Sequence, residues 1–176
     1  LHNIVYNAFK EILGEDHPDT LRSLANLSIS YTLLGDYTTA LEMRKVVYNA
    51  RKEILRENHP LTLSALNDIA NSYSDLGDYS KALDLQKTVY NARKKILGES
   101  HLSTLYTLHN LAISYADLGD NKKELELYEK IYVISKEILG ENHPDTLLVL
   151  SNLLVSQILQ NETDNQSIKK SLNAYF

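Results

Sequence analysis

The 176-residue chain contains no cysteine and no tryptophan, and it has only three prolines and two phenylalanines. Without cysteine it cannot form a disulfide, a thiolate zinc site, an iron–sulfur cluster or a cysteine nucleophile. Positive charge is also scarce, because 23 acidic residues outnumber 18 basic ones and give a net charge of -5. A nucleic-acid surface needs an excess of positive charge, so we expect no nucleic-acid partner.

Long apolar runs are missing as well, since none approaches the roughly 18 residues that a membrane helix requires. The first residues show no charged segment followed by an apolar one, so no secretory leader is visible. Hydrophobic residues make up 43% of the chain and charged residues 23%, which is typical of a globular protein. We therefore expect a cytoplasmic protein with no membrane partner.

What the chain does contain is a repeat of 42 residues. Residues 17–58 and 59–100 are identical at 23 of 42 positions without any insertion. Several residue types recur at this interval, among them His17, His59, His101 and His143, Gly35, Gly77 and Gly119, and Tyr31, Tyr73 and Tyr115. Such periodicity indicates an array of similar structural units.

The repeat divides the chain into parts of unequal completeness. Because residues 5–15 resemble residues 47–57, we expect residues 1–16 to be the second helix of a truncated repeat, in a segment of a longer array. Whole repeats follow at 17–58, 59–100 and 101–142, and residues 143–176 form a degenerate repeat or a C-terminal cap. In this last part Ile168, Leu172 and Tyr175 keep a helical stripe within an otherwise polar segment.

Each repeat has the pattern of two α-helices. In residues 17–34 the apolar positions recur every three or four residues, which places them on one helical face. A good N-cap residue precedes this helix in every repeat; the expected caps are Asp16, Asn58, Ser100 and Asn142. In the whole repeats the helix ends at Leu-Gly-Asp, where the glycine can adopt the left-handed conformation. A second helix is expected from about Tyr37 to Leu55. No β-alternation competes, so we predict an all-α fold. One helix pair cannot bury its apolar face alone, and stacked pairs would form an α-solenoid.

The rows of identical residues are best explained by structure. The four repeated histidines belong to different repeats, roughly 16–20 Å apart by helix packing distances, so they cannot share a zinc ion. We expect each of them to donate a local hydrogen bond at a helix start. The tyrosine rows favour packing, and the row of lysines near the second-helix ends suits the helix dipole.

His109 lies outside these rows, and we expect it to make a polar contact. Asn121 and Glu124 replace the Tyr and Ala of the third turn, which predicts looser packing there.

Motifs of catalysis are missing. The sequence has no Walker A motif, no dinucleotide-binding glycine pattern, no H-E-x-x-H and no G-x-S-x-G. No nucleophile is found with a base and an orienting partner. We therefore predict a protein that is not an enzyme and has no cofactor or metal.

The repeat resembles the tetratricopeptide repeat. The resemblance lies in Leu24-x-x-Leu27-Ser28-x-x-Tyr31, Gly35, Tyr37 and Ala40, and in the matching positions of the next repeats. The usual period of that family is about 34, and a period of 42 adds about 12 Å of helix. The segment Leu139–Thr146 and the triplet Asn110-Leu111-Ala112 resemble the kinesin-light-chain type of this repeat. The resemblance implies a right-handed superhelical α-solenoid of antiparallel helix pairs.

The resemblance also implies a concave groove, lined by the first helices, in which a partner peptide binds. The helical wheel independently places certain residues opposite the packed face. These candidates are Arg22, Asn26, Ile29, Leu33, Ser64, Asn67, Asp68, Asn71, Asp75, Tyr106, His109, Asn110, Ile113, Asp117, Ser151 and Asn152.

The charge of these candidates suggests the kind of partner. Arg22 is the only cation among them, whereas Asp68, Asp75 and Asp117 are acidic, so we expect a neutral or basic peptide. The leading hypothesis is a protein–protein interaction scaffold. The alternatives are a regulatory or sensor segment of a larger multidomain enzyme or NTPase, and a self-assembly module.

Overall fold

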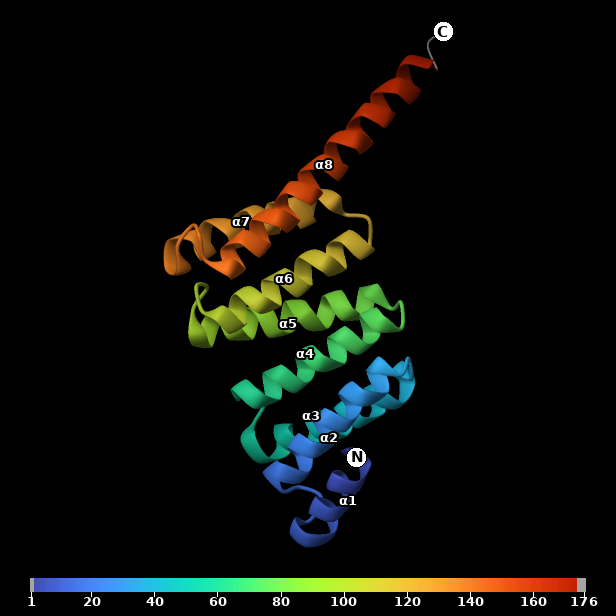
Figure 1. The fold of residues 1–176 in the computed structure, drawn as a ribbon, viewed down its shortest axis with the longest axis vertical. Helices are drawn as coiled ribbons and strands as arrows, with labels where there is room; N and C mark the ends of the chain where they lie inside the picture. The colour runs from blue at the N-terminus through green and yellow to red at the C-terminus, as the bar shows by residue number, and fades with distance from the viewer. Residues whose placement is uncertain (1, 174–176) are drawn as a thin grey trace. The chain divides into compact units, whose positions relative to one another are not determined.

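The computed structural model describes residues 2–173, and it describes the side chains of residues 2–162. Within this range the chain forms helices and no strand, which confirms the all-α prediction (Figure 1). The helices are α1 (His2–Leu13), α2 (Pro18–Leu33), α3 (Tyr37–Leu55), α4 (Pro60–Asp75), α5 (Tyr79–Leu97), α6 (Leu102–Asp117), α7 (Asn121–Leu139) and α8 (Pro144–Asn173). The side chains of Ile168 and Leu172, and all of Tyr175, lie outside the described residues.

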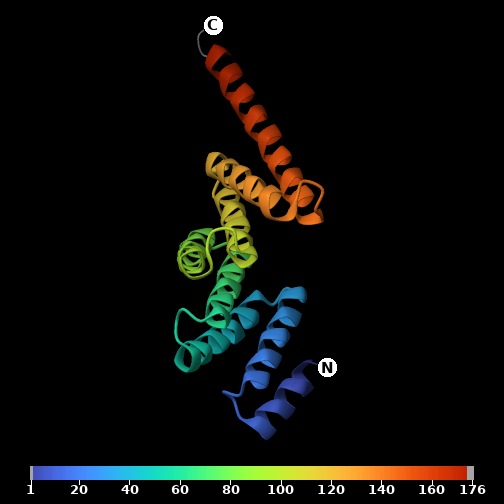
Figure 2. The same ribbon diagram turned by 90° about the vertical axis from the view of Figure 1, so that its left-hand side faces the viewer.

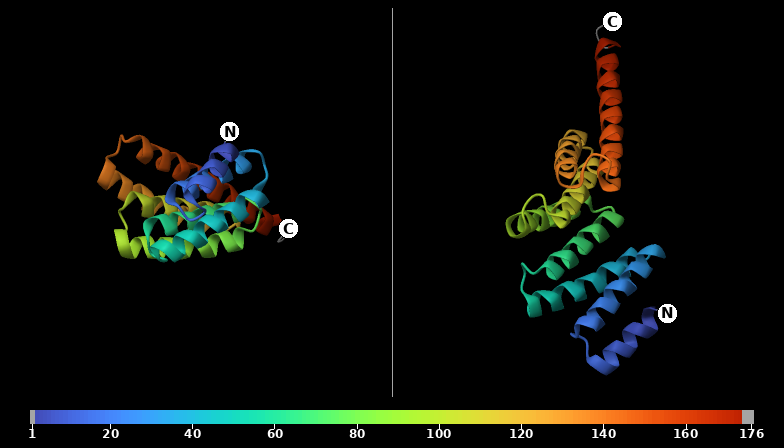
Figure 3. Two further views of the ribbon diagram at one scale, coloured as in Figure 1. Left: turned by 90° about the horizontal axis from the view of Figure 1, so that it is seen from below. Right: turned by 60° about the vertical axis from the view of Figure 1, so that its left-hand side comes forward.

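The helices belong to two compact units, residues 1–96 and 97–176. In the first unit, α1 to α4 run back and forth as successive antiparallel helices (Figure 3, right). In the second unit, α7 packs against both α6 and α8, and α8 starts beside α7 and continues past it (Figure 2). No helix within residues 2–173 is long and apolar enough to cross a membrane.

The helix starts differ from the prediction at the cap itself. The N-caps of α2, α4 and α6 are the repeated histidines, not the residues before them. In each case Nδ1 of the imidazole accepts a hydrogen bond from the backbone N–H two residues later, at 3.1–3.2 Å. His143 makes the same contact with the N–H of Asp145. These histidines therefore accept, rather than donate, the local hydrogen bond.

The turn between paired helices is the one expected. Gly35, Gly77 and Gly119 have φ of 80°, 79° and 78°, the left-handed conformation that ends a helix tightly. The aspartate that follows caps the next helix, and Oδ1 of Asp36 accepts from the N–H of Thr39 at 3.1 Å. The predicted second helix, Tyr37–Leu55, is confirmed.

Leucine stripes of the first helices form the core of each unit. In the first unit Leu24 and Leu27 of α2 pack with Val47 of α3, and Leu63 and Leu66 of α4 pack with Val89 of α5. Ala40 and Ala82 are 1% and 0% exposed, as small residues at close helix approaches should be. The buried apolar residues of the second unit are Leu105, Leu108, Leu111, Ala112, Tyr128, Ile131, Val149 and Leu153.

Glu124 and the lysine row make contacts that the sequence pattern does not predict. Glu124 of α7 accepts a hydrogen bond from Oγ of Ser156 in α8 at 2.8 Å, so a polar contact joins these helices. Burial and the negative charge of Glu124 raise the pKa of Tyr128 to about 12. The lysine row is not simply solvated, because Nζ of Lys52 lies 5.7 Å from the centre of the Tyr48 ring and pairs with Glu57.

Candidate functional site

The candidates on α2 are accessible to a partner. Ile29 and Leu33 are 51% and 83% exposed, and Asn26 and Arg22 are exposed as well. Arg22 also donates to the carboxylate of Asp19 at 2.9 Å, a surface pair that leaves the guanidinium open to solvent. This helix therefore offers apolar and hydrogen-bonding groups together.

The candidates on α4 are less accessible than expected. Asn67 is buried, at 3% exposure, although the helical wheel places it on the solvent side. Ser64, Asp68 and Asn71 are half-buried, and only Asp75 is exposed. The reason is that side chains from the neighbouring second helices cover this face.

The side chains that cover this face include Arg44 and Arg51 of α3 and Arg93 of α5, and these three arginines surround Asp68. Arg44 donates to the carbonyl oxygen of Asp68 at 3.1 Å and also to Oγ of Ser72, and Arg93 donates to Oγ of Ser64 at 3.0 Å. Burial raises the pKa of the Asp68 carboxyl, while the positive charges of Arg44, Arg51 and Arg93 oppose that rise. The surroundings of Asp68 are thus rich in positive charge.

This cluster changes the charge expected for the first unit. Sequence reasoning counted only residues of the first helices, so it found Arg22 and missed the arginines of the second helices. The signal was present, because Arg51 and Arg93 occupy the same position in consecutive repeats. In the first unit, positive charge from the second helices therefore accompanies the acidic Asp68.

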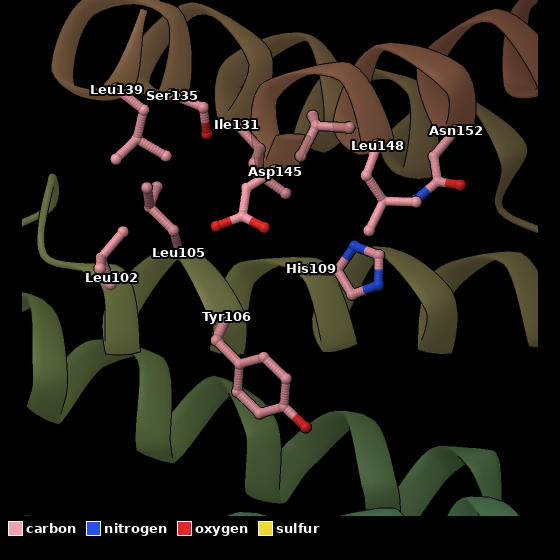
Figure 4. A pocket seen from close by; sticks show the side chains of 11 residues that line it. Leu102, Leu105, Tyr106, His109, Ile131, Ser135, Leu139, Asp145, Leu148 and Asn152 are labelled. Atoms are coloured by element: carbon pink, nitrogen blue, oxygen red, sulfur yellow. The ribbon is translucent and has the colours of Figure 1, made fainter. Parts of the chain in front are cut away.

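The second unit contains a cavity of about 330 Å³ between α6, α7 and α8, which we call the α6–α8 pocket (Figure 4). It is lined by Leu102, Leu105, Tyr106, His109, Ile131, Ser135, Leu139, Asp145, Leu148, Val149 and Asn152. Three of the candidates, Tyr106, His109 and Asn152, meet here. The remaining candidates of this unit do not line it: Asn110 is buried at 8% exposure, and Ile113, Asp117 and Ser151 are exposed elsewhere.

The pocket combines apolar walls with the polar side chains of Tyr106, His109, Ser135, Asp145 and Asn152. Figure 4 shows the Asp145 carboxylate directed from α8 towards α6, between Leu105 and His109. The imidazole of His109 packs edge-on against Tyr128 at 5.6 Å, and burial lowers its pKa, which favours the neutral ring. Asn152 stands beside Leu148 on α8.

These polar groups are open to a ligand. Among the residues whose side chains are described, none donates a hydrogen bond to the Asp145 carboxylate. The nearest ionisable group is His143, whose Nδ1 lies 3.8 Å away and already accepts from the backbone N–H of Asp145. Sequence reasoning missed Asp145 because it stands in the first turn of its helix, one turn before the candidate positions.

The arrangement suits binding. An apolar cavity with a few convergent polar groups is the usual composition of a binding site. Within the described residues, no three His, Asp or Glu side chains are grouped so that they could hold a metal ion.

Comparison with known proteins supports the repeat assignment. A model of the tetratricopeptide repeat family matches residues 1–53 and 61–132, more than half of the chain. No curated protein matches. Among solved structures, the chain resembles two crystal structures of a putative kinesin light chain from Podosopora anserina with nearly identical TPR-like repeats, one of them a variant. Both are 26% identical in sequence, with TM-scores of 0.77 and 0.75, over 98% of this chain and 82% of that one.

A third structure shows the same fold at lower identity. BtubC (BKLC) from P. vanneervenii matches with a TM-score of 0.76 and 16% identity, over 99% of this chain and 73% of that one. Together these similarities establish the α-solenoid class of helix pairs.

Proposed function

Because the chain belongs to the tetratricopeptide repeat family, with repeats of the kinesin-light-chain type, we propose that it is a scaffold that binds a partner protein segment on the face of α6 and α8. Repeats of this family generally mediate protein–protein interaction. The observation that carries the proposal is the α6–α8 pocket, in which Tyr106, His109 and Asn152 from two consecutive first helices meet. The partner segment is neutral or basic, since Asp145 lines the pocket and the lining contains no lysine or arginine.

The first unit offers a second contact surface on α2 and α4. Its exposed residues Asn26, Ile29 and Leu33 would contact the backbone and apolar side chains of a partner. The arginines around Asp68 make this surface less suited to a basic segment than the α6–α8 face.

Site-specific photo-crosslinking tests the proposal. A photoreactive phenylalanine analogue at Tyr106, which is 54% exposed beside the pocket, should capture a discrete partner in cells. The same analogue at exposed Val133 of α7 is the matched control and should not capture that partner. With the purified partner, Tyr106→Ala plus Leu148→Ala should weaken binding at least about tenfold, since buried aromatic and apolar anchors dominate interfaces. Unchanged affinity in a folded variant would refute the proposed face.

Self-association is a second candidate, and the outer face of α8 favours it. Leu147 and Leu154 are 48% and 50% exposed, whereas the residue that corresponds to Leu147 in α2, Leu21, is 4% exposed. In the part of the chain that the structure describes, no helix covers this face. Exposed apolar residues of this kind are typical of interaction surfaces.

Light scattering coupled to size exclusion tests the second candidate. The chain should form dimers or larger species at high concentration, and Leu147→Ser with Leu154→Ser should return it to a monomer. Val133→Ser, at another exposed apolar residue, should leave the association unchanged. A strict monomer at high concentration would exclude this candidate.

A further inference from the structure

The two units allow one position to be compared in different repeats. Residue 135 in α7 corresponds to residue 51 in α3, because the repeats are offset by two periods. The first unit has Arg51 at this position, α5 has Arg93 in the intervening repeat, and α7 has Ser135. Of these three helices, α3 and α5 therefore have a long cationic side chain at this position, and α7 has a small neutral one.

One hydrogen bond at this position recurs in both units. In the first unit, Oγ1 of Thr62 donates to the carbonyl oxygen of Arg51 at 3.2 Å. In the second unit, Oγ1 of Thr146 donates to the carbonyl oxygen of Ser135 at 3.3 Å. The change from arginine to serine thus leaves the junction between the helices in place and removes only the side chain.

Arg51 shows what the space accommodates. Its side chain is half-buried between α3 and α4, and its guanidinium donates to the carbonyl oxygen of Leu61 at 3.2 Å. The negative charge of Asp68, further along α4, also acts on it. In the first unit, an arginine of the chain itself therefore occupies the place between α3 and α4.

At the corresponding place, the second unit has the α6–α8 pocket and the carboxylate of Asp145, but no arginine. Ser135 is small and buried at 3% exposure, and it lines the α6–α8 pocket. Residue 145, the counterpart of Leu61, is an aspartate at the rim of the pocket; its side chain is 70% exposed and is directed towards α6 (Figure 4). Asn152 replaces the acid of Asp68 and keeps an acceptor oxygen there.

We propose that the α6–α8 pocket receives an arginine side chain of the partner, which fills in the second unit the space that Arg51 fills in the first. This inference rests on the proposed binding function and names the chemical group that the site recognises. The aliphatic stem of the arginine packs against Leu105 and Leu148, and the guanidinium pairs with the Asp145 carboxylate. Such a pair forms charge-assisted hydrogen bonds, which are stronger than neutral ones.

The rest of the lining suits the same group. Tyr106 is exposed at the edge of the pocket, and its ring extends away from Asp145, so it leaves the space beside that carboxylate open (Figure 4). His109 is held in its neutral form by burial, so it does not repel a positive charge. A partner glutamate, by contrast, would face the Asp145 carboxylate without a compensating cation in the lining.

The test uses a defined probe and no partner protein. Acetyl-arginine methylamide is titrated into the full chain, and the imidazole signals of His109 and the amide signal of Asp145 are followed by NMR. The expected result is a saturable shift of both signals with the arginine probe and none with acetyl-citrulline methylamide, which has the same shape without the charge. Equal shifts with the two probes would overturn the proposal.

Two variants locate the binding. Asp145→Asn should weaken the probe about two- to fivefold, because the ion pair with an exposed carboxylate is lost. Glu137→Gln, which removes an exposed acid of α7 outside the pocket, is the matched control and should leave affinity unchanged. Ser135→Arg should abolish binding by restoring the side chain that the first unit carries. If both Asp145→Asn and a folded Ser135→Arg bind the probe as the unmodified chain does, the proposal is wrong.

The probe and the crosslinking experiment fail independently. A partner captured at Tyr106, together with no arginine binding, would refute only the choice of arginine. Probe binding without a partner at Tyr106 would refute the proposed scaffold role and leave the arginine site intact.

Discussion

At the scale of single residues, Arg56 is the most strained position that the structure describes. Its φ of 77° and ψ of 165° lie in a region that is essentially restricted to glycine. The corresponding positions in the other repeats are Gly14, Gly98 and Gly140, with φ of 90°, 90° and 95°. The junction after α3 therefore has the same backbone as the others, but with a side chain that disfavours it.

Replacing Arg56 with glycine should stabilise the protein. We expect Arg56→Gly to raise the free energy of unfolding by about 1–3 kcal/mol, which is the usual cost of such strain. Urea denaturation followed by circular dichroism measures the change. Arg56→Ala is the control, since it removes the same charge and keeps the strained backbone, and it should give no such gain. A glycine variant no more stable than the alanine variant would contradict the expectation.

His109 should make stability depend on pH. Burial lowers its pKa below the ordinary value of 6.5, so the unfolded chain binds the proton more readily than the folded one. The contribution of His109 is complete above pH 6.5 and is lost as the pH falls below that value. The His109→Gln variant should lose less stability than the unmodified chain between about pH 7.5 and pH 5, as measured by urea denaturation. Identical pH profiles would show that the ring is not held neutral.

At the scale of helices, Arg44 connects three elements of the first unit. Its guanidinium donates to Oγ1 of Thr32 on α2 and to the carbonyl oxygen of Asp68 on α4, while its own backbone belongs to α3. A charged group that bonds to two neighbouring helices fixes their positions more firmly than apolar packing alone.

Removing the Arg44 guanidinium should therefore destabilise the first unit. Arg44→Met keeps the aliphatic stem and should cost about 1.5–3 kcal/mol, the range for hydrogen bonds to charged groups. Lys45→Met breaks only a surface pair with Glu42 and should cost less than about 1 kcal/mol. Thermal unfolding of the two variants measures the difference, and equal losses would mean that Arg44 does not tie the helices together.

The helices themselves could be predicted from sequence, and their contacts only in part. Leucine spacing and the glycine turns determine where helices run, and the observed second helix Tyr37–Leu55 matches the prediction. The histidine caps were missed because the residue before each histidine is a stronger N-cap by residue type. The arginines near Asp68 were missed because a wheel drawn for one helix does not show which side chains reach it from another. Asn67 is buried for the same reason.

At the scale of the whole molecule, stability should be local. Within each unit, the strongest contacts join helices that are neighbours in sequence, such as α2 with α3 and α7 with α8. In repeat proteins stability is close to a sum of repeat and nearest-neighbour contributions. Damage to one unit should therefore be felt mainly within that unit.

A core substitution in the second unit tests this expectation. Leu108 is 1% exposed, and Leu108→Ala should cost about 2–5 kcal/mol. Hydrogen exchange should speed up in α6 and α7 more than in α2 and α3. The matched variant Leu24→Ala, in the core of the first unit, should give the opposite pattern. Uniform acceleration along the chain in either variant would indicate global unfolding instead.

The sequence alone also predicted the family at this scale, because a 42-residue period with fixed leucine, tyrosine and glycine positions is visible without coordinates. The proposed binding place was harder to predict from sequence. One residue that lines the α6–α8 pocket is Ser135. A serine attracts no attention by itself, and this one stands out only because the two preceding repeats have arginine at the corresponding position. The depth of the pocket arises from a missing side chain, which a search for functional motifs does not detect.

The substitution at residue 135 has a consequence for engineering. If one small residue and one aspartate convert a filled junction into an arginine receptor, the same pair of changes should convert another junction. Arg51→Ser with Leu61→Asp would give the first unit its own receptor and make the chain bivalent. Ser135→Arg with Asp145→Leu would close the existing one and leave a chain with no receptor. Under the proposal, two side chains in a repeat decide whether it binds an arginine, while the helices that carry them stay the same.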